Sequence, residues 1–123
     1  KEAAAIVARV VAPTFPNRDF DITKYGAVGD SKQDCTAAIA QAIAACARAG
    51  VPILHVHGDN DQMVPLGRNS GLLIERYKDL GGKACLIVPH GHGHEVTPAF
   101  FENQAIVNFV IDPTTIDQPV PSE

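Results

Sequence analysis

Two short apolar runs organise the second half of this chain. The first lies within residues 51–56 and the second within residues 85–88. Short apolar runs that end at turn residues predict buried β-strands. Between them, the segment GRNSGLLIERYKDLGG carries apolar residues at helical spacing and ends at a glycine pair. We therefore expect a β-α-β unit with parallel strands and a right-handed crossover.

Two further helices are expected on either side of this unit. Residues 35–49 predict a helix with Asp34 as its N-cap and Gly50 as its end. Its apolar stripe is narrow and has alanines beside it; it consists of Ile39, Ile43 and Cys46. A last helix is expected to follow Thr97 with Pro98 at its first position, and its core face would use Phe100, Phe101, Ile106, Val107, Phe109 and Val110. The predicted fold class is α/β, a small parallel sheet flanked by helices.

Acidic and imidazole side chains follow the two predicted strands. Asp59 and Asp61 come after the first strand, and the histidines of His90-Gly-His-Gly-His94 come after the second. Open α/β sheets keep their chemistry at the carboxyl ends of the strands. An acid after one strand and a histidine after the next is the order of the last two members of a Ser…Asp…His triad. We expect Asp61 and His94 to face each other; the alternative for Asp61, and the expectation for Asp59, is turn or capping chemistry.

The first member of such a triad is not visible in the sequence. The available serines are Ser31, Ser70 and Ser122. None lies in Gly-x-Ser-x-Gly, and none follows a strand into a helix as a nucleophile elbow requires. No oxyanion-hole loop of the His-Gly-Gly type is present either. The sequence thus predicts an acid and a histidine without their nucleophile.

Residues 51–111 resemble the C-terminal part of an α/β-hydrolase of the esterase and peptidase-like kind. The features that carry the resemblance are HGDNDQMVP, the helix described above, the strand KACLIVP, the loop HGHGHE and the segment PAFFENQAIVNFVI. The carboxylate of the family's Gly-x-x-Asp-x-x-Val-Pro motif corresponds to Asp61. The histidine of its Gly-x-Gly-His motif corresponds to His94. The resemblance implies serine-type hydrolysis, with Asp61 as orienting acid and His94 as general base.

Residues 3–50 resemble a different family. FDITKYGAVGD followed by DCTAAIAQAI is similar to the N-terminal entry of glycoside hydrolase family 28, the polygalacturonases, and more loosely to pectate-lyase-like β-helices. The resemblance implies a β-helix-type capping segment and a carbohydrate setting. The family's Asn-Thr-Asp and Asp-Asp motifs are absent, although Gly91-His-Gly93 matches a third motif in its letters. We therefore divide the chain into segments 1–50, 51–111 and a Pro-rich tail, 112–123, which we expect to be loose.

Composition excludes several classes of partner. The chain has 123 residues, a net charge of −4 and no basic run, which argues against nucleic acid. No apolar run is long enough to span a bilayer, and we expect no membrane partner. Lys1-Glu2 opens no signal-peptide pattern, although the resembled families suggest a secreted or periplasmic setting. The three cysteines predict buried thiols.

Metal binding is the competing chemistry for the same residues. His55, His57, Asp59 and Asp61 alternate along the chain, as do the three histidines of residues 90–94, and such side chains can converge on Zn²⁺ or Ni²⁺. The His-x-His-x-Asp-His motif of metallo-β-lactamase-like hydrolases would need a histidine where Asn60 stands. For His55, alternation along the strand favours a buried, hydrogen-bonded histidine over a metal ligand. We expect no cofactor and no metal.

The sequence-based conclusion is a hydrolase-derived chain. The expected activity is that of part of a serine-type ester hydrolase acting on carbohydrate esters or small esters. The alternatives are a fragment or chimera without activity, and part of a polygalacturonase-like glycosidase. A sheet of so few strands leaves exposed edges, from which we expect self-association.

Overall fold

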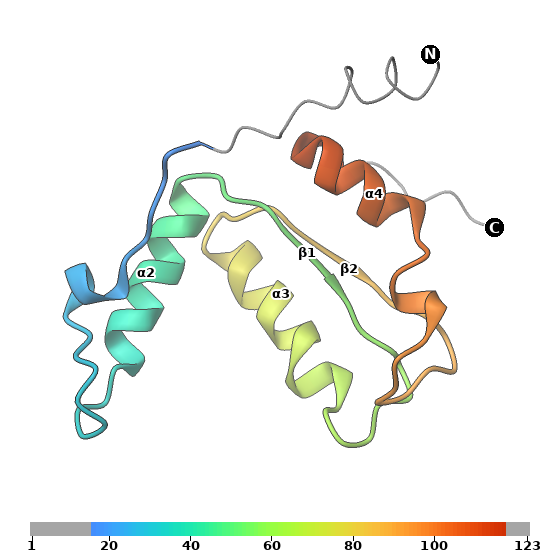
Figure 1. Cartoon of the computed structure of the whole chain (residues 1–123), viewed down its shortest axis with the longest axis horizontal. Helices are drawn as coiled ribbons and strands as arrows, with labels where there is room; N and C mark the ends of the chain where they lie inside the picture. Colours follow the sequence, from blue (N-terminus) through green and yellow to red (C-terminus); the bar gives the residue numbers. More distant parts are fainter. Residues whose placement is uncertain (1–15, 118–123) are drawn as a thin grey trace, which may run out of the picture.

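The computed structural model describes residues 16–117, and its centre is a small parallel sheet. Strand β1 (Ile53–Val56) pairs in parallel with β2 (Ala84–Ile87), and helix α3 (Ser70–Asp79) connects them. Helix α3 lies along one side of the two strands, and α2 (Thr36–Arg48) lies beside α3 (Figure 1). The predicted α/β class with a small parallel sheet and its β-α-β unit is confirmed. Within the described residues, no helix is long and apolar enough to cross a membrane.

The core lies between the sheet and α3. Ile53 pairs with Ala84, and His55 pairs with Leu86. Because side chains alternate along a strand, these four residues share the face of the sheet that α3 covers. Tyr77, only 1% exposed, fills the centre of this layer, and its hydroxyl donates a hydrogen bond to the Val51 carbonyl at 2.6 Å. The remaining members of the core cluster are Ala47 and Ile74.

Helix α2 forms as expected but buries a different face. The N-cap position is Cys35, one residue after the predicted Asp34, and the Cys35 side chain makes no capping hydrogen bond. The Asp34 carboxylate still accepts the Thr36 N–H at 2.8 Å from just before the cap. The residues that it buries are three alanines, Ala38, Ala42 and Ala47. Ile39 and Ile43 of the predicted stripe are 43% and 39% exposed, so that prediction was wrong. The small alanine side chains allow α2 to approach its neighbours closely, and the isoleucines are left on the outside.

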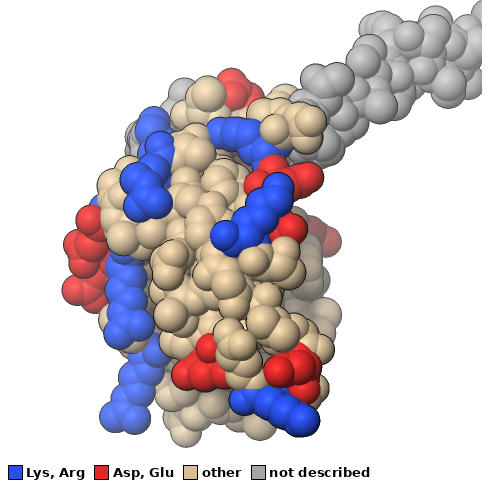
Figure 2. All heavy atoms as spheres, turned by 90° about the vertical axis from the view of Figure 1, so that its left-hand side faces the viewer, with Lys and Arg blue, Asp and Glu red and all other residues tan. Residues whose placement is uncertain are grey.

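The face of the molecule that carries α2 is largely uncharged at its centre. Figure 2 shows this patch with Lys and Arg side chains, and Asp and Glu side chains, along its margins. Ile39 and Ile43 are exposed on α2, and Leu73 and Leu80 are exposed on and just after α3. A shallow hollow between the two helices is lined by Ile43, Leu72, Leu73 and Leu80, among others.

The first fifty residues do not form a β-helix coil in the described part of the chain. Residues 16–50 contain a single 3-10 turn at Ile22–Tyr25, a loop and α2, without a strand. The N-terminal segment joins the same core as the second half, because Ala47 belongs to the cluster around Tyr77. The β-helix-type capping arrangement is therefore not shown, and the helix at its end packs as part of the α/β layer.

The C-terminal helix begins later than predicted. Pro98–Phe100 is a separate 3-10 turn, and α4 spans Gln104–Ile111. Asn103 is the cap of α4, because its side chain accepts the Ala105 N–H at 2.9 Å. No residue of α4 is buried, and Val107 and Val110 of the predicted core face are exposed. An asparagine cap inside the predicted helix divides it into two short pieces.

The described part of the tail, residues 112–117, contains a turn where a loose segment was predicted. Pro113–Asp117 form a 3-10 turn next to α4 and β2. Ile116 is only 6% exposed, so one apolar side chain of the tail is buried. Residues 1–15 and 118–123, which include Ser122, lie outside the described part of the chain.

The two-stranded sheet predicts self-association. Among residues 16–117, each strand pairs on one side only, so one edge of β1 and one edge of β2 are open. Open edges pair readily with further strands. In sedimentation equilibrium, we expect the average mass to rise above 13.0 kDa as the protein concentration increases. A mass of 13.0 kDa at every concentration would contradict this expectation.

Candidate active site

The loops that follow the two strands are joined to each other. The Asn60 N–H donates to the His92 carbonyl at 3.0 Å, and the Gly91 N–H donates to Asp59 Oδ1 at 2.7 Å. Gly58 lies against the backbone of His92, and a Cβ at this position would overlap the His92 carbonyl oxygen. Parallel pairing brings both loops to the same end of the sheet, and these contacts fix how they face each other.

The structure brings Asp61 and His94 together, as the order of the motifs predicts. His94 Nδ1 lies 3.0 Å from Asp61 Oδ2. Asp61 is buried, whereas the His94 side chain is 54% exposed. A carboxylate oxygen accepts, so the shared proton is on Nδ1 of His94. The Nε2 atom of the neutral imidazole is then a proton acceptor.

Asp61 also caps its own turn. It therefore makes both contacts that the sequence proposed as alternatives, one with His94 and one with the turn. Its Oδ1 atom accepts the N–H groups of Met63 and Val64 at 3.0 and 2.8 Å, while Oδ2 faces His94. The Val64 N–H, and after it the hydrogen bond from His94, lower the pKa of Asp61 against the effect of burial. The carboxylate therefore remains ionised near neutral pH and orients the imidazole electrostatically.

Asp59 forms a second acid–histidine pair outside the centre of the site. His90 Nδ1 lies 2.8 Å from Asp59 Oδ2, and His90 is 89% exposed. The His90 hydrogen bond and the Gly91 N–H lower the pKa of Asp59. The prediction for Asp59 was turn or capping chemistry; in the structure its partners lie in the other loop. This residue links the two loops across the end of the sheet.

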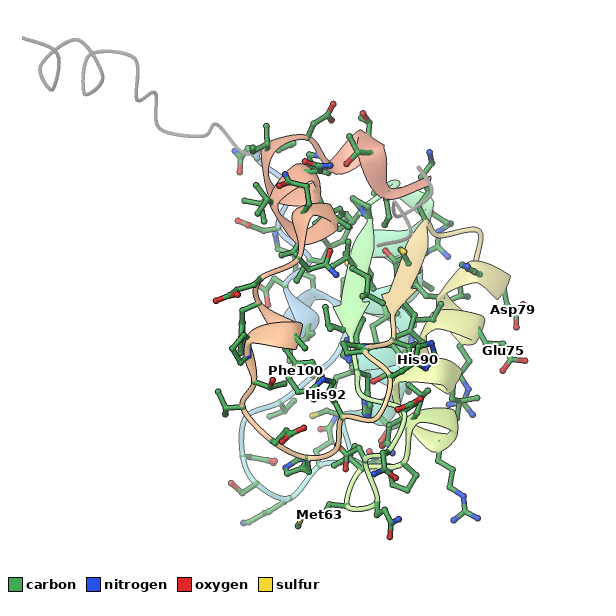
Figure 3. All side chains as sticks on the ribbon, turned by 90° about the vertical axis from the view of Figure 1, so that its right-hand side faces the viewer. Met63, Glu75, Asp79, His90, His92 and Phe100 are labelled. Carbon is green, nitrogen blue, oxygen red and sulfur yellow. The ribbon has the colours of Figure 1, made fainter. Side chains whose placement is uncertain are left out.

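His92 takes no part in the Asp61 pair. Its Nδ1 atom lies 2.8 Å from Glu95 Oε1, and its ring meets Phe100 edge-on with centroids 6.0 Å apart. Figure 3 shows His92 beside Phe100, with His90 on the other side of the loop. The His92 hydrogen bond lowers the pKa of Glu95. The three histidines of residues 90–94 therefore have three different carboxylate partners.

Behind Asp61 lies a polar cluster that sequence reasoning foresaw only in part. The predicted hydrogen bonding of His55 is confirmed, although its side chain is only partly buried, and the partners His57 and Ser70 were missed. Ser70 Oγ lies 2.5 Å from His57 Nδ1 and 2.8 Å from His55 Nε2. His57 Nε2 lies 2.8 Å from the Val64 carbonyl and 3.6 Å from Asp61 Oδ2. The signal was present in the sequence. Because side chains alternate along an extended strand, His55 and His57 share the face of Ile53, which is the face that α3 covers.

A cavity of about 430 Å³ opens beside the Asp61–His94 pair. Its lining includes His57, Asp61, His94 and Phe100, but Ser70 is not part of it. Ser70 is only 4% exposed, and Ser31 lies in an exposed loop of the N-terminal segment. Among the described residues, no serine hydroxyl is hydrogen-bonded to His94.

The residues proposed for a metal site are distributed among other partners. His55 and His57 contact Ser70, Asp59 contacts His90, and Asp61 contacts His94. Within residues 16–117, no group of three or more His, Cys, Asp or Glu side chains is arranged to hold a metal ion. The three cysteines are free and half-buried, rather than fully buried as predicted.

No family model matches this chain, and neither a curated protein nor a solved structure does so. The chemistry of the site is therefore argued from its own atoms. They are an ionised, buried carboxylate, an imidazole with its second nitrogen free to accept a proton, and a cavity beside them. This arrangement can orient a general base toward a bound molecule.

Replacing Gly58 by alanine should separate the two loops. The new methyl group would occupy the position of the His92 carbonyl oxygen, so the backbone must shift and the Asn60–His92 hydrogen bond must lengthen. We expect the free energy of unfolding, measured in urea, to fall by about 1–3 kcal/mol. The matched control is Gly67→Ala, where nothing lies near the added carbon. Equal stability of the two variants would show that the loops do not meet at Gly58.

Stability should decrease as the pH falls through 6.5. Burial, and after it the nearby His57, lowers the pKa of His55 below this ordinary value, so the unfolded chain takes up the proton first. The carboxylates with lowered pKa lose their contribution only in stronger acid, below their ordinary values of 3.8 for Asp59 and Asp61 and 4.5 for Glu95. We expect urea melts at about pH 7.5 and about pH 5.5 to differ less for His55→Gln than for the native chain. Identical differences would refute the assignment to His55.

Proposed function

We propose that this chain carries the acid–histidine half of a serine-type ester hydrolase, with Asp61 as the orienting acid and His94 as the general base. The observation that carries the proposal is the 3.0 Å hydrogen bond between the buried carboxylate and the half-exposed imidazole. In such a pair the carboxylate holds the imidazole in one tautomer and stabilises the imidazolium that forms during the reaction. The neighbouring cavity supplies space for an ester beside His94.

The chemistry assigned to His94 is proton transfer at Nε2. This atom takes the proton of a hydroxyl group as its oxygen attacks the ester carbonyl, and later returns the proton to the leaving alcohol. Neither described serine is placed for that attack: Ser70 is buried, and Ser31 lies in the N-terminal loop. Water is then the hydroxyl source for this chain alone, and the expected rate is low because triad members act as a unit.

The order of elements supports an origin in the C-terminal part of an α/β-hydrolase. Strand β1, the Asp61 loop, α3, β2 and the His94 loop follow one another as in that family's motifs. The likeness of residues 3–50 to family 28 glycoside hydrolases favours carbohydrate esters as the substrate class. Because the two halves resemble different families, an inactive fragment or chimera is the competing proposal, ahead of a polygalacturonase-like glycosidase.

Hydrolysis of p-nitrophenyl acetate tests the proposed roles. His94→Gln and Asp61→Asn should each lower the second-order rate constant by about tenfold, less than the hundredfold or more of a complete site. Asparagine retains an oxygen for the Met63 and Val64 N–H groups but presents an amide to His94. The matched controls are His90→Gln and Asp59→Asn, which alter the same chemical pair away from the cavity lining.

Equal losses for the two pairs of variants would contradict a special role for Asp61 and His94. The intact mass after treatment with a fluorophosphonate tests whether a serine of this chain acts as a nucleophile. The proposal predicts an unmodified mass of 13.0 kDa. An adduct on this chain would mean that one of its own serines is a nucleophile.

A further inference from the structure

The cluster behind Asp61 has only one consistent arrangement of protons when both of its histidines are neutral. The Val64 carbonyl can only accept, so His57 Nε2, 2.8 Å away, carries a proton. His57 Nδ1 is then an acceptor, and the hydrogen bond at 2.5 Å is donated by the Ser70 hydroxyl. Ser70 has no second proton, so His55 Nε2 donates to Ser70 Oγ at 2.8 Å. The neutral state of His55 agrees with its burial, which lowers its pKa.

This proton arrangement supports the turn that contains Asp61. The Val64 residue joins both sides of the turn, because its carbonyl accepts from His57 while its N–H donates to Asp61 Oδ1 at 2.8 Å. The His57 Nε2 atom also lies 3.6 Å from Asp61 Oδ2, the oxygen that faces His94. The other ring nitrogen of His57, Nδ1, is hydrogen-bonded to Ser70 at the start of α3. A continuous chain of contacts thus leads from α3 to the Asp61 carboxylate.

We propose that His57 is the positioning residue of the Asp61–His94 pair, and that Ser70 fixes its tautomer. By holding Val64, His57 keeps Asp61 Oδ2 directed at His94 Nδ1 and so keeps the proton of His94 on that nitrogen. The positioning role follows from the geometry of the protein itself. Only its consequence for catalysis rests on the proposed function. Ser70 has a structural role here: it is 4% exposed and outside the cavity lining.

Long-range ¹H–¹⁵N correlation spectra of the histidine rings test the proton arrangement in the unmodified chain at neutral pH. We expect His55 and His57 to be protonated at Nε2 and His94 at Nδ1. Two different tautomers within one site are what the hydrogen-bond acceptors require. A proton on Nδ1 of neutral His57, or on Nε2 of neutral His94, would overturn the inference.

Two substitutions at His57 separate positioning from general stability. Glutamine retains an N–H donor for the Val64 carbonyl, whereas leucine has none. We expect His94 to remain protonated at Nδ1 in His57→Gln and to shift toward the Nε2-protonated form in His57→Leu. The resonances of His90, whose pairing with Asp59 lies outside the cavity lining, serve as an internal reference. An unchanged His94 tautomer in a folded His57→Leu protein would overturn the inference.

Ser70→Ala supplies an independent test should the leucine variant fail to fold. Without the Ser70 hydroxyl, His57 Nδ1 loses its donor, and we expect signals from both tautomers of His57. A single unchanged Nε2–H form would overturn the role of Ser70, as would a fluorophosphonate adduct on its hydroxyl. Ester hydrolysis is a separate readout: if the native chain is inactive but these tautomers are found, the proposed function fails and the positioning role of His57 stands.

Discussion

The contact between the two loops at the carboxyl end of the sheet is the constraint on which the candidate site depends. It requires glycine at position 58, because the backbone of His92 occupies the space that a side chain would need. The Asn60 and Gly91 N–H groups then cross between the loops. Parallel strands place the loops side by side, but it is this close approach that sets Asp61 opposite His94. Every acid–histidine contact between the loops follows from it.

Asp61 shows how one side chain serves local and tertiary structure together. Its Oδ1 atom completes a turn with Met63 and Val64, and its Oδ2 atom faces His94. The turn by itself holds the carboxylate in place and favours its ionised form, without any contact from the second loop. His57 and Ser70 support the same turn from α3. The site therefore combines a rigid acid with a histidine that is still half-exposed to solvent.

The outer surfaces of the molecule have a different character. Helix α2 buries alanines and exposes Ile39 and Ile43, while α4 has no buried residue. A two-stranded sheet has too little area to cover the apolar faces of three helices. Several large apolar side chains of the helices therefore remain exposed to solvent in the described part of the chain. The exposed apolar side chains are the physical basis for the expected self-association.

Local sequence patterns determined the strands at residues 53–56 and 84–87, the existence of helices α2 and α3, and the pairing of Asp61 with His94. These features depend on hydrophobic period, turn residues and the rule that parallel strands present their carboxyl ends together. The division of the last helix at Asn103 is also local, because the Asn103 side chain accepts the Ala105 N–H, but the hydrophobic pattern did not single it out. The buried face of α2 and the His55–Ser70–His57 cluster were decided by tertiary structure. Each depends on which neighbour is available to pack or to share a proton. A periodic pattern predicts which residues can be buried. Only the assembled fold determines which of them pack against a neighbour or form a hydrogen bond.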